Sequence, residues 1–199
     1  MKFAVTGGIA AGKTLVADML REQGIMLLDA DRLALDFISN SAEMHQRITA
    51  EFGEDSYTAD GQLNRKLLAS KLFADSSALT RYNAIYQPAW LEQLRYTIDA
   101  AVQQGTIGLD AALIGEWEIA DWFEMIILVT ASPEVRIARL QKTRGMSRKE
   151  AEDRIQAQLS DQDRRLIATE VIVNDSGVEE LRHDVKRLAR LIMGASTRL

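Results

Sequence analysis

The sequence predicts an α/β protein built on a parallel β-sheet, and three observations support this. First, an apolar strand, a glycine turn, a helix and a second apolar strand follow one another within about 30 residues, the order of a βαβ unit. Second, three further short apolar segments come later, at residues 107–110, 125–129 and 171–174. Third, the stretch from residue 32 to about 104 carries apolar residues at helical spacing, which indicates a helical insertion.

Local signals place the other elements. Gly24 follows the first helical pattern, and glycine commonly ends a helix. Pro133 suits the first turn of a helix, where the missing N–H costs nothing. The predicted elements are buried strands at 2–6 and 25–28, helices at about 13–22, 133–143 and 178–192, and an exposed, highly charged helix-loop-helix at 144–165.

The composition fits a soluble globular protein. The 199 residues are 47% hydrophobic and 27% charged, and no run of about 18 apolar residues is present to span a membrane. The chain has no cysteine, which excludes disulfides and thiolate metal sites and fits a reducing compartment. The net charge of −5 argues against general nucleic-acid binding. We expect a cytoplasmic protein, monomeric or weakly homo-oligomeric, with neither a membrane nor a nucleic acid as partner.

The glycine turn matches the phosphate-binding pattern G-x-x-x-x-G-K-[ST]. The glycines let backbone N–H groups turn toward phosphate oxygens, and the following helix points its positive end at the same anion. In this pattern Lys13 reaches the β- and γ-phosphates and the Thr14 hydroxyl ligates Mg²⁺. The predicted nucleotide-binding residues here are Gly7, Gly8, Ile9, Ala10, Ala11, Gly12, Lys13, Thr14 and Leu15.

An ordinary glycine turn before a helix is the simpler explanation of this pattern. Its place between a predicted strand and a predicted helix favours phosphate binding. The pattern does not tell kinases, GTPases and motor ATPases apart. The guanine motif N-K-x-D is absent, and 199 residues are too few for most motor ATPases. A kinase of small molecules is the remaining large class.

Several motifs in the same order resemble those of dephospho-coenzyme A kinases. The loop matches T-G-G-I-G-S-G-K-[ST], and Asp29-Ala30-Asp31 matches the family's D-A-D after the second strand. The later matches are Phe52-Gly53, Asp60 to Arg65 with Leu68 and Phe73 (F-G…D-G-x-L-[ND]-R…L…[VI]-F), Asn83 to Pro88 (L-N-x-I-x-H-P), Asp110 to Glu116 (D-V-P-L-L-x-E) and Asn174 (N-[ND]-G). The likeness covers roughly residues 2–190.

The resemblance implies an enzyme that phosphorylates the ribose 3′-hydroxyl of dephospho-coenzyme A with ATP. It also implies a three-layer P-loop kinase fold with an inserted helical substrate domain and a mobile helical lid. The expected divisions are a nucleotide-binding core at 1–31, 105–142 and 166–199, a substrate-binding domain at 32–104 and a lid at 143–165.

Two aspartates at strand ends are the candidates for catalysis and metal binding. Asp31, the second aspartate of D-A-D, is the predicted general base, because the carboxyl end of the second strand faces the crevice above the loop. One of Asp29 and Asp31 could instead cap the next helix, and we assign the structural role to Asp29. Asp110 ends the third strand and is expected to hold Mg²⁺ through water, with a helix cap as its alternative.

The charged segment after the fourth strand supplies the candidate lid arginines. One arginine is predicted to close on the γ-phosphate, and the candidates for it are Arg139 and Arg144, with Arg164 next. The simpler explanation is a solvated helix face with paired charges. Asn174 is expected to contact the nucleotide. The predicted substrate-binding residues are Thr6, Arg65, Gln87 and Glu116.

The chain departs from the family pattern at several positions. Ala10 and Ala11 replace glycine and serine, and alanine at position 10 is harmless only if its φ is negative. Gln87 replaces histidine and Ala112 replaces proline. The lid at 141–146 is one residue shorter than the family's motif. These departures leave two alternatives open, a related kinase of a nucleoside or other small alcohol, and a nucleotide-binding protein that has lost catalysis.

Overall fold

The computed structural model describes residues 1–75 and 77–196. Parts of the predicted ranges 32–104 and 166–199, namely Ser76 and residues 197–199, lie outside the described residues. The chain divides into two compact units, Met1–Asp29 with Ala100–Leu199, and Ala30–Asp99. The predicted lid at 143–165 therefore belongs to the first unit, together with the sheet.

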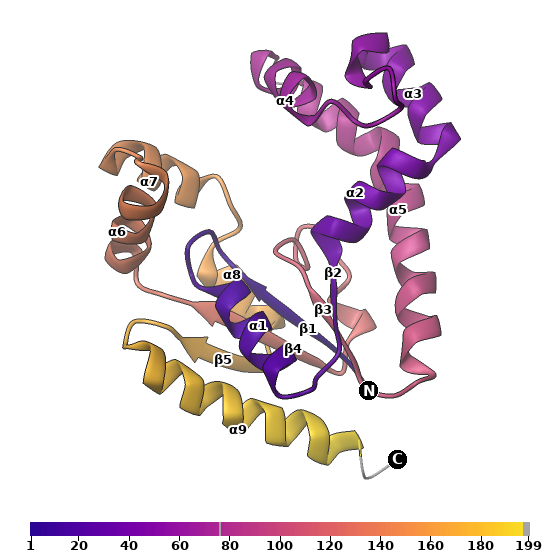
Figure 1. Cartoon of the computed structure of the whole chain (residues 1–199). Coiled ribbons are helices and arrows are strands. Elements are labelled where there is room, and N and C mark those ends of the chain that lie inside the picture. The colour runs from indigo at the N-terminus through magenta and orange to yellow at the C-terminus, as the bar shows by residue number, and fades with distance from the viewer. Residues whose placement is uncertain (76, 197–199) are drawn as a thin grey trace. The chain divides into compact units, whose positions relative to one another are not determined.

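The first unit contains an all-parallel sheet of five strands in the order β2-β3-β1-β4-β5 (Figure 1). The central strand β1 has β3 and β4 on its two sides, and its residues from Phe3 on are buried. Such burial explains its continuous apolar sequence. The strands are β1 Lys2–Gly7, β2 Leu27–Asp29, β3 Ile107–Asp110, β4 Met125–Thr130 and β5 Glu170–Val173.

The predicted α/β class and parallel sheet are confirmed, but the second strand was misplaced. β2 begins at Leu27 rather than Ile25, and it is an edge strand paired only with β3. Leu27 and Leu28 are half-buried and Asp29 is exposed, so the prediction of a buried strand was wrong. An apolar run cannot by itself tell an edge strand from a central one, because the neighbour comes from distant sequence.

Helices α1 (Lys13–Glu22) and α9 (Val178–Ser196) pack against each other and against the sheet (Figure 1). The helix α9 buries one stripe at helical spacing. Its buried residues are Leu181, Val185, Leu188, Ala189 and Ile192. This stripe meets Val16, Met19 and Leu20 of α1 and the central strands in one apolar core, which fixes α1, and with it the glycine turn, to the end of β1.

Three helices lie between β4 and β5 in the chain, and they are not all at the surface. They are α6 Pro133–Arg144, α7 Arg148–Gln156 and α8 Asp161–Ile167. Ile137 and Leu140 of α6 form an apolar cluster with Ala151 of α7, and Ile9 and Ala10 of the glycine turn pack against it. Arg164 is only 1% exposed, so the prediction of an exposed segment was wrong at this residue. Its charge is matched by partners described below.

The second unit is helical, as its sequence predicts. Its helices are α2 Ala30–Asn40, α3 Ala42–Phe52, the short 3₁₀ helix η1 Glu54–Ser56, α4 Arg65–Ala74 and α5 Ala78–Val102, whose last residues belong to the first unit. Met44, Ile48 and Phe52 of α3 pack with Leu68 of α4 in its apolar core. No helix in the described part of the chain is long and apolar enough to cross a membrane.

Gly108 provides a test of the packing of the sheet. A Cβ atom at this position in β3 would overlap the ring of Phe3 on β1. We expect Gly108→Ala to lower the free energy of unfolding by about 1–3 kcal/mol, the usual result of overfilling a packed core. Gly194→Ala is the matched control, because that exposed glycine of α9 has nothing within 4 Å of the added atom. Urea unfolding measures both, and equal stability of the two variants would contradict the packing described.

Candidate nucleotide and phosphate site

The glycine turn joins the buried end of β1 to the start of α1. Ala11 N donates to the carbonyl of Gly8 (3.1 Å) and Val16 N donates to that of Gly12 (3.1 Å), so the turn folds back on itself. Gly12 has a φ of 102°. In the described structure no side chain caps α1, and its first turn has no acidic residue. Its first N–H groups therefore have no anionic side chain of their own and can bind an anion.

Asn174 binds the turn next to the start of α1. It follows β5, is 5% exposed, and its Nδ2 donates to the carbonyl of Ala11 (2.8 Å). Its backbone N donates to the carbonyl of Thr130 at the end of β4 (2.7 Å). A Cβ atom on Gly12 would overlap the Asn174 amide. Glycine at position 12 is thus required for two reasons, its positive φ and the close approach of Asn174.

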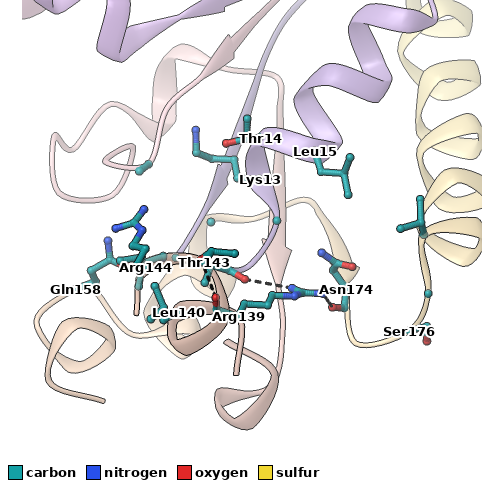
Figure 2. A pocket seen from close by; sticks show the side chains of 18 residues that line it. Lys13, Thr14, Leu15, Arg139, Leu140, Thr143, Arg144, Gln158, Asn174 and Ser176 are labelled. Carbon is teal, nitrogen blue, oxygen red and sulfur yellow. Dashed lines mark hydrogen bonds between the residues drawn. The ribbon is translucent and has the colours of Figure 1, made fainter. Parts of the chain in front are cut away.

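Two arginines of α6 bind carbonyl oxygens of the turn. Arg139 Nη1 donates to the carbonyls of Ala10 (3.1 Å) and Ala11 (3.3 Å), and its Nη2 donates to that of Asn174 (2.9 Å) (Figure 2). Arg136 Nε donates to the carbonyl of Ile9 (2.8 Å). These contacts engage carbonyl oxygens of the turn. The amides of Ile9 and Ala11 are already bonded, so a ligand would bind the other amide groups of the turn. Closure of Arg139 on a γ-phosphate stays a prediction.

A pocket of about 780 Å³ opens beside the turn (Figure 2), a size suited to a cofactor-sized ligand. Lys13, Thr14 and Leu15 enter it from α1, and Arg139, Leu140, Thr143 and Arg144 enter it from α6. Gln158 and the loop after β5 complete the wall. The lining residues are Gly7, Gly8, Ile9, Ala10, Gly12, Lys13, Thr14, Leu15, Ala112, Arg139, Leu140, Thr143, Arg144, Gln158, Asn174, Ser176, Gly177 and Val178.

The structure brings most of the predicted nucleotide-binding residues to this one pocket. The exception is Ala11, a fully buried residue of the turn that does not line the pocket. Arg144, the last residue of α6, also lines the pocket, as its predicted role requires.

Asp110 lies at the end of β3 with its side chain 7% exposed, and it pairs with Lys13 of the turn. Arg21 Nη2 lies 3.5 Å from the second oxygen of the same carboxylate. Across the described residues, no group of three or more His, Cys, Asp or Glu side chains is placed to hold a metal ion. Mg²⁺ commonly binds one or two protein groups together with substrate phosphates. Asp110 and the Thr14 hydroxyl fit that kind of site.

Two predicted substrate-binding residues make structural contacts. Glu116 Oε1 accepts from Arg164 Nη2 (3.2 Å), whose guanidinium also binds the carbonyl of Leu159. Thr6 is 1% exposed, and its hydroxyl donates to the carbonyl of Ala112 (3.2 Å). Arg164, our further lid candidate, therefore compensates Glu116 inside the unit. A substrate role for Thr6 and Glu116 stays a prediction.

In the second unit, Asp31 stands in the first turn of α2 and Gln87 lies within α5. Burial raises the pKa of Tyr86, the neighbour of Gln87, and the negative charge of Asp31 raises it further. Asp31 therefore lies near the segment that contains Gln87.

The motif D-G-x-L-N-R has a structural explanation in the same unit. Gly61 adopts a φ of 79° in a turn, and Asn64 caps α4 by accepting from Leu67 N (3.3 Å). Arg65 is then the first residue of α4. The motif thus places an arginine at a defined helix start, and its contact with substrate stays a prediction.

Two residues that hold the turn were not singled out from the sequence. Arg136 was part of the charged run, yet it is 4% exposed, and burial lowers its pKa although the carboxylate of Asp161 partly offsets this. Its spacing of three residues from Arg139, one helical turn, was the available signal. Gln158 accepts from Ile9 N (2.7 Å) and lines the pocket. No local pattern marks this glutamine, because its partner is distant in sequence.

Ala10 has a φ of 60°, so the condition under which alanine is harmless there is not met. A left-handed alanine costs about 1–2 kcal/mol. Glycine removes that strain but adds about 0.5–1 kcal/mol of chain entropy to the unfolded state.

We expect Ala10→Gly to raise the free energy of unfolding by up to about 1 kcal/mol. Ala11→Gly, the same change at a fully buried neighbour without a positive φ, should lower it by about 1 kcal/mol. Urea unfolding of both variants tests this, and a loss of stability in Ala10→Gly as large as in Ala11→Gly would contradict it.

Solved structures share this fold. TT1252 from Thermus thermophilus is 28% identical, with a TM-score of 0.76 over 94% of this chain and 95% of that chain. The dephospho-CoA kinase from Campylobacter jejuni gives the same TM-score of 0.76 over 98% of this chain and all of its own, at 18% identity, which shows the fold alone. The predicted class, an α/β kinase fold around a phosphate loop, is confirmed.

Sequence comparison gives the family. The family model described as dephospho-CoA kinase matches residues 1–180. A protein from Streptomyces avermitilis named dephospho-CoA kinase is 36% identical over 185 residues, which cover 93% of this chain and 90% of that protein. The matched range, residues 1–180, spans the phosphate turn, the helix α6 and Asn174. This chain belongs to the dephospho-CoA kinase family.

Proposed function

We propose that this protein transfers the terminal phosphoryl group of ATP to the ribose 3′-hydroxyl of dephospho-coenzyme A. The observation that carries the proposal is the phosphate turn, with Lys13 and the uncapped start of α1 beside a pocket of about 780 Å³. Relatives that span nearly the whole chain are named for this activity.

The chain's own residues supply the phosphate site. Amide groups of the turn other than those of Ile9 and Ala11, together with the first turn of α1, bind phosphate oxygens. Arg136, Arg139 and Asn174 hold the turn by binding its carbonyl oxygens. Lys13 is already inside the pocket and donates to the β- and γ-phosphates. Arg144 at the pocket wall, with Arg139 nearby, compensates the charge that develops during transfer.

A magnesium ion belongs to this proposal. When bound, Mg²⁺ would neutralise charge on the transferred phosphoryl group. We assign the Thr14 hydroxyl as its direct ligand and Asp110 as the residue that would hold it through water. Thr14 lines the pocket, and Asp110 pairs with Lys13. Both residues belong to the first unit, and Thr14 follows Lys13 in the sequence.

Asp31 is the proposed general base, which accepts the proton of the attacking 3′-hydroxyl. It follows the end of β2 by two positions, and the carboxyl ends of parallel strands are where reactive groups collect in such folds. We assign substrate contacts to Arg65, Gln87, Glu116 and Thr6. We also assign a substrate-binding role to residues 32–104, a lid role to residues 143–165 and a cytoplasmic location to the protein, as a monomer or weak homo-oligomer.

A coupled assay of ADP release with a panel of acceptors tests the proposal. Dephospho-coenzyme A should support turnover, while adenosine, AMP and shikimate should not. Gln87, in place of the family's histidine, is the reason for including the nucleosides. Turnover on another acceptor alone would assign a different substrate. Binding of ATP without transfer to any acceptor would leave a nucleotide-binding protein without catalysis.

The base assignment makes a separate prediction. Asp31→Asn should lower kcat about 10²- to 10⁴-fold, the usual contribution of a general base, and leave the KM for ATP within about twofold. Asp29→Asn, two residues earlier at the end of β2, is the matched control and should keep kcat within about threefold. Steady-state kinetics and a thermal melt of each variant give the comparison. If Asp29→Asn loses more activity than Asp31→Asn at equal stability, the two roles are reversed.

A further inference from the structure

The buried carboxylate of Asp110 is shared by two cations. Lys13 pairs with Oδ1, and Arg21 Nη2 lies 3.5 Å from Oδ2. The Asp110 side chain is 7% exposed, and those of Lys13 and Arg21 are 16% and 34% exposed. The two cations come from opposite ends of α1, since Lys13 is its first residue and Arg21 lies in its last turn.

This arrangement creates a conflict for the phosphate turn. Lys13 is paired with Asp110, yet it is also the residue that must reach the phosphates of the nucleotide. Moving it away would leave a buried carboxylate without its closest partner, which is unfavourable. The carboxylate would keep a cation only if a second one is already in place.

Arg21 is held in position to be that cation. Its Nη1 donates to Asp18 Oδ1 one turn earlier on α1 (2.9 Å), while its Nη2 faces Asp110. Asp18 is well exposed, with a side chain 58% accessible, so this pair alone contributes little to stability. Its effect is to orient the guanidinium toward the carboxylate at the end of β3.

We propose that Arg21 is a positioning residue for nucleotide binding, which keeps Asp110 paired when Lys13 transfers to the phosphates. The inference rests on the proposed function, because it requires that the turn binds ATP. Without Arg21, release of Lys13 leaves Asp110 uncompensated until Mg²⁺ arrives beside it. Arg21 therefore reduces the dependence of ATP binding on Mg²⁺, although it touches neither the nucleotide nor the metal.

Calorimetric titration of the full chain with ATP, once in EDTA and once with Mg²⁺, tests this. In EDTA, Arg21→Gln should weaken ATP binding about fivefold, as expected of a half-exposed cation beside a buried carboxylate. With saturating Mg²⁺ the loss should shrink to less than about twofold, because the metal compensates Asp110. By reciprocity, Mg²⁺ should bind the complex of Arg21→Gln with ATP more tightly than it binds that of the unchanged protein.

Two further variants separate this role from a general effect of charge or stability. Arg21→Lys keeps the cation and should restore most of the affinity in EDTA. Arg182→Gln removes a cation of similar exposure that pairs with Glu22 on the same helix α1, and it should change neither titration.

Each other outcome has a distinct meaning. Equal affinity of Arg21→Gln and the unchanged protein in EDTA would overturn the proposal, and so would an equal loss with and without Mg²⁺, which indicates damage to the site. If the unchanged protein fails to bind ATP under either condition, the proposed function itself fails.

Discussion

The site depends on the side chains that bind the carbonyl groups of the phosphate turn. Arg136 binds the carbonyl of Ile9, Arg139 binds those of Ala10 and Ala11, and Asn174 binds that of Ala11 as well. By binding these carbonyl oxygens, the three side chains hold the turn in a conformation whose remaining amides can bind an anion. Glycine at position 12 follows from the same requirement, because any Cβ there would displace the Asn174 amide.

The helix α6 carries both arginines and also packs against the predicted lid. Ile137 and Leu140 on its buried face join Ala151 of α7, and the turn residues Ile9 and Ala10 lie against this cluster. The turn is therefore bound to α6 by polar contacts and by apolar packing together. A movement of α6 and α7 would act directly on the conformation of the turn, including the strained Ala10 at a φ of 60°.

Much of this arrangement was predictable from local sequence. The turn, the first helix at 13–22 and the strands β1, β3, β4 and β5 follow from glycine spacing and apolar periodicity. Position within the sheet was not predictable, and β2 was misplaced because its edge position depends on distant partners. The same limit applies to Arg136, Arg164 and Gln158. Each lies in a charged or polar stretch of sequence. Only the folded chain brings Arg136 and Gln158 to Ile9, and Arg164 to Glu116.

The central claim is that this site directs the phosphoryl group of ATP to one hydroxyl of dephospho-coenzyme A. Phosphorus NMR of the reaction mixture tests it most directly, because it identifies the position of the new phosphate as well as its formation. The account predicts one new phosphomonoester, on the ribose 3′-oxygen, in an amount equal to the ADP formed. ADP with inorganic phosphate and no new ester, or a phosphate on another oxygen, would contradict it.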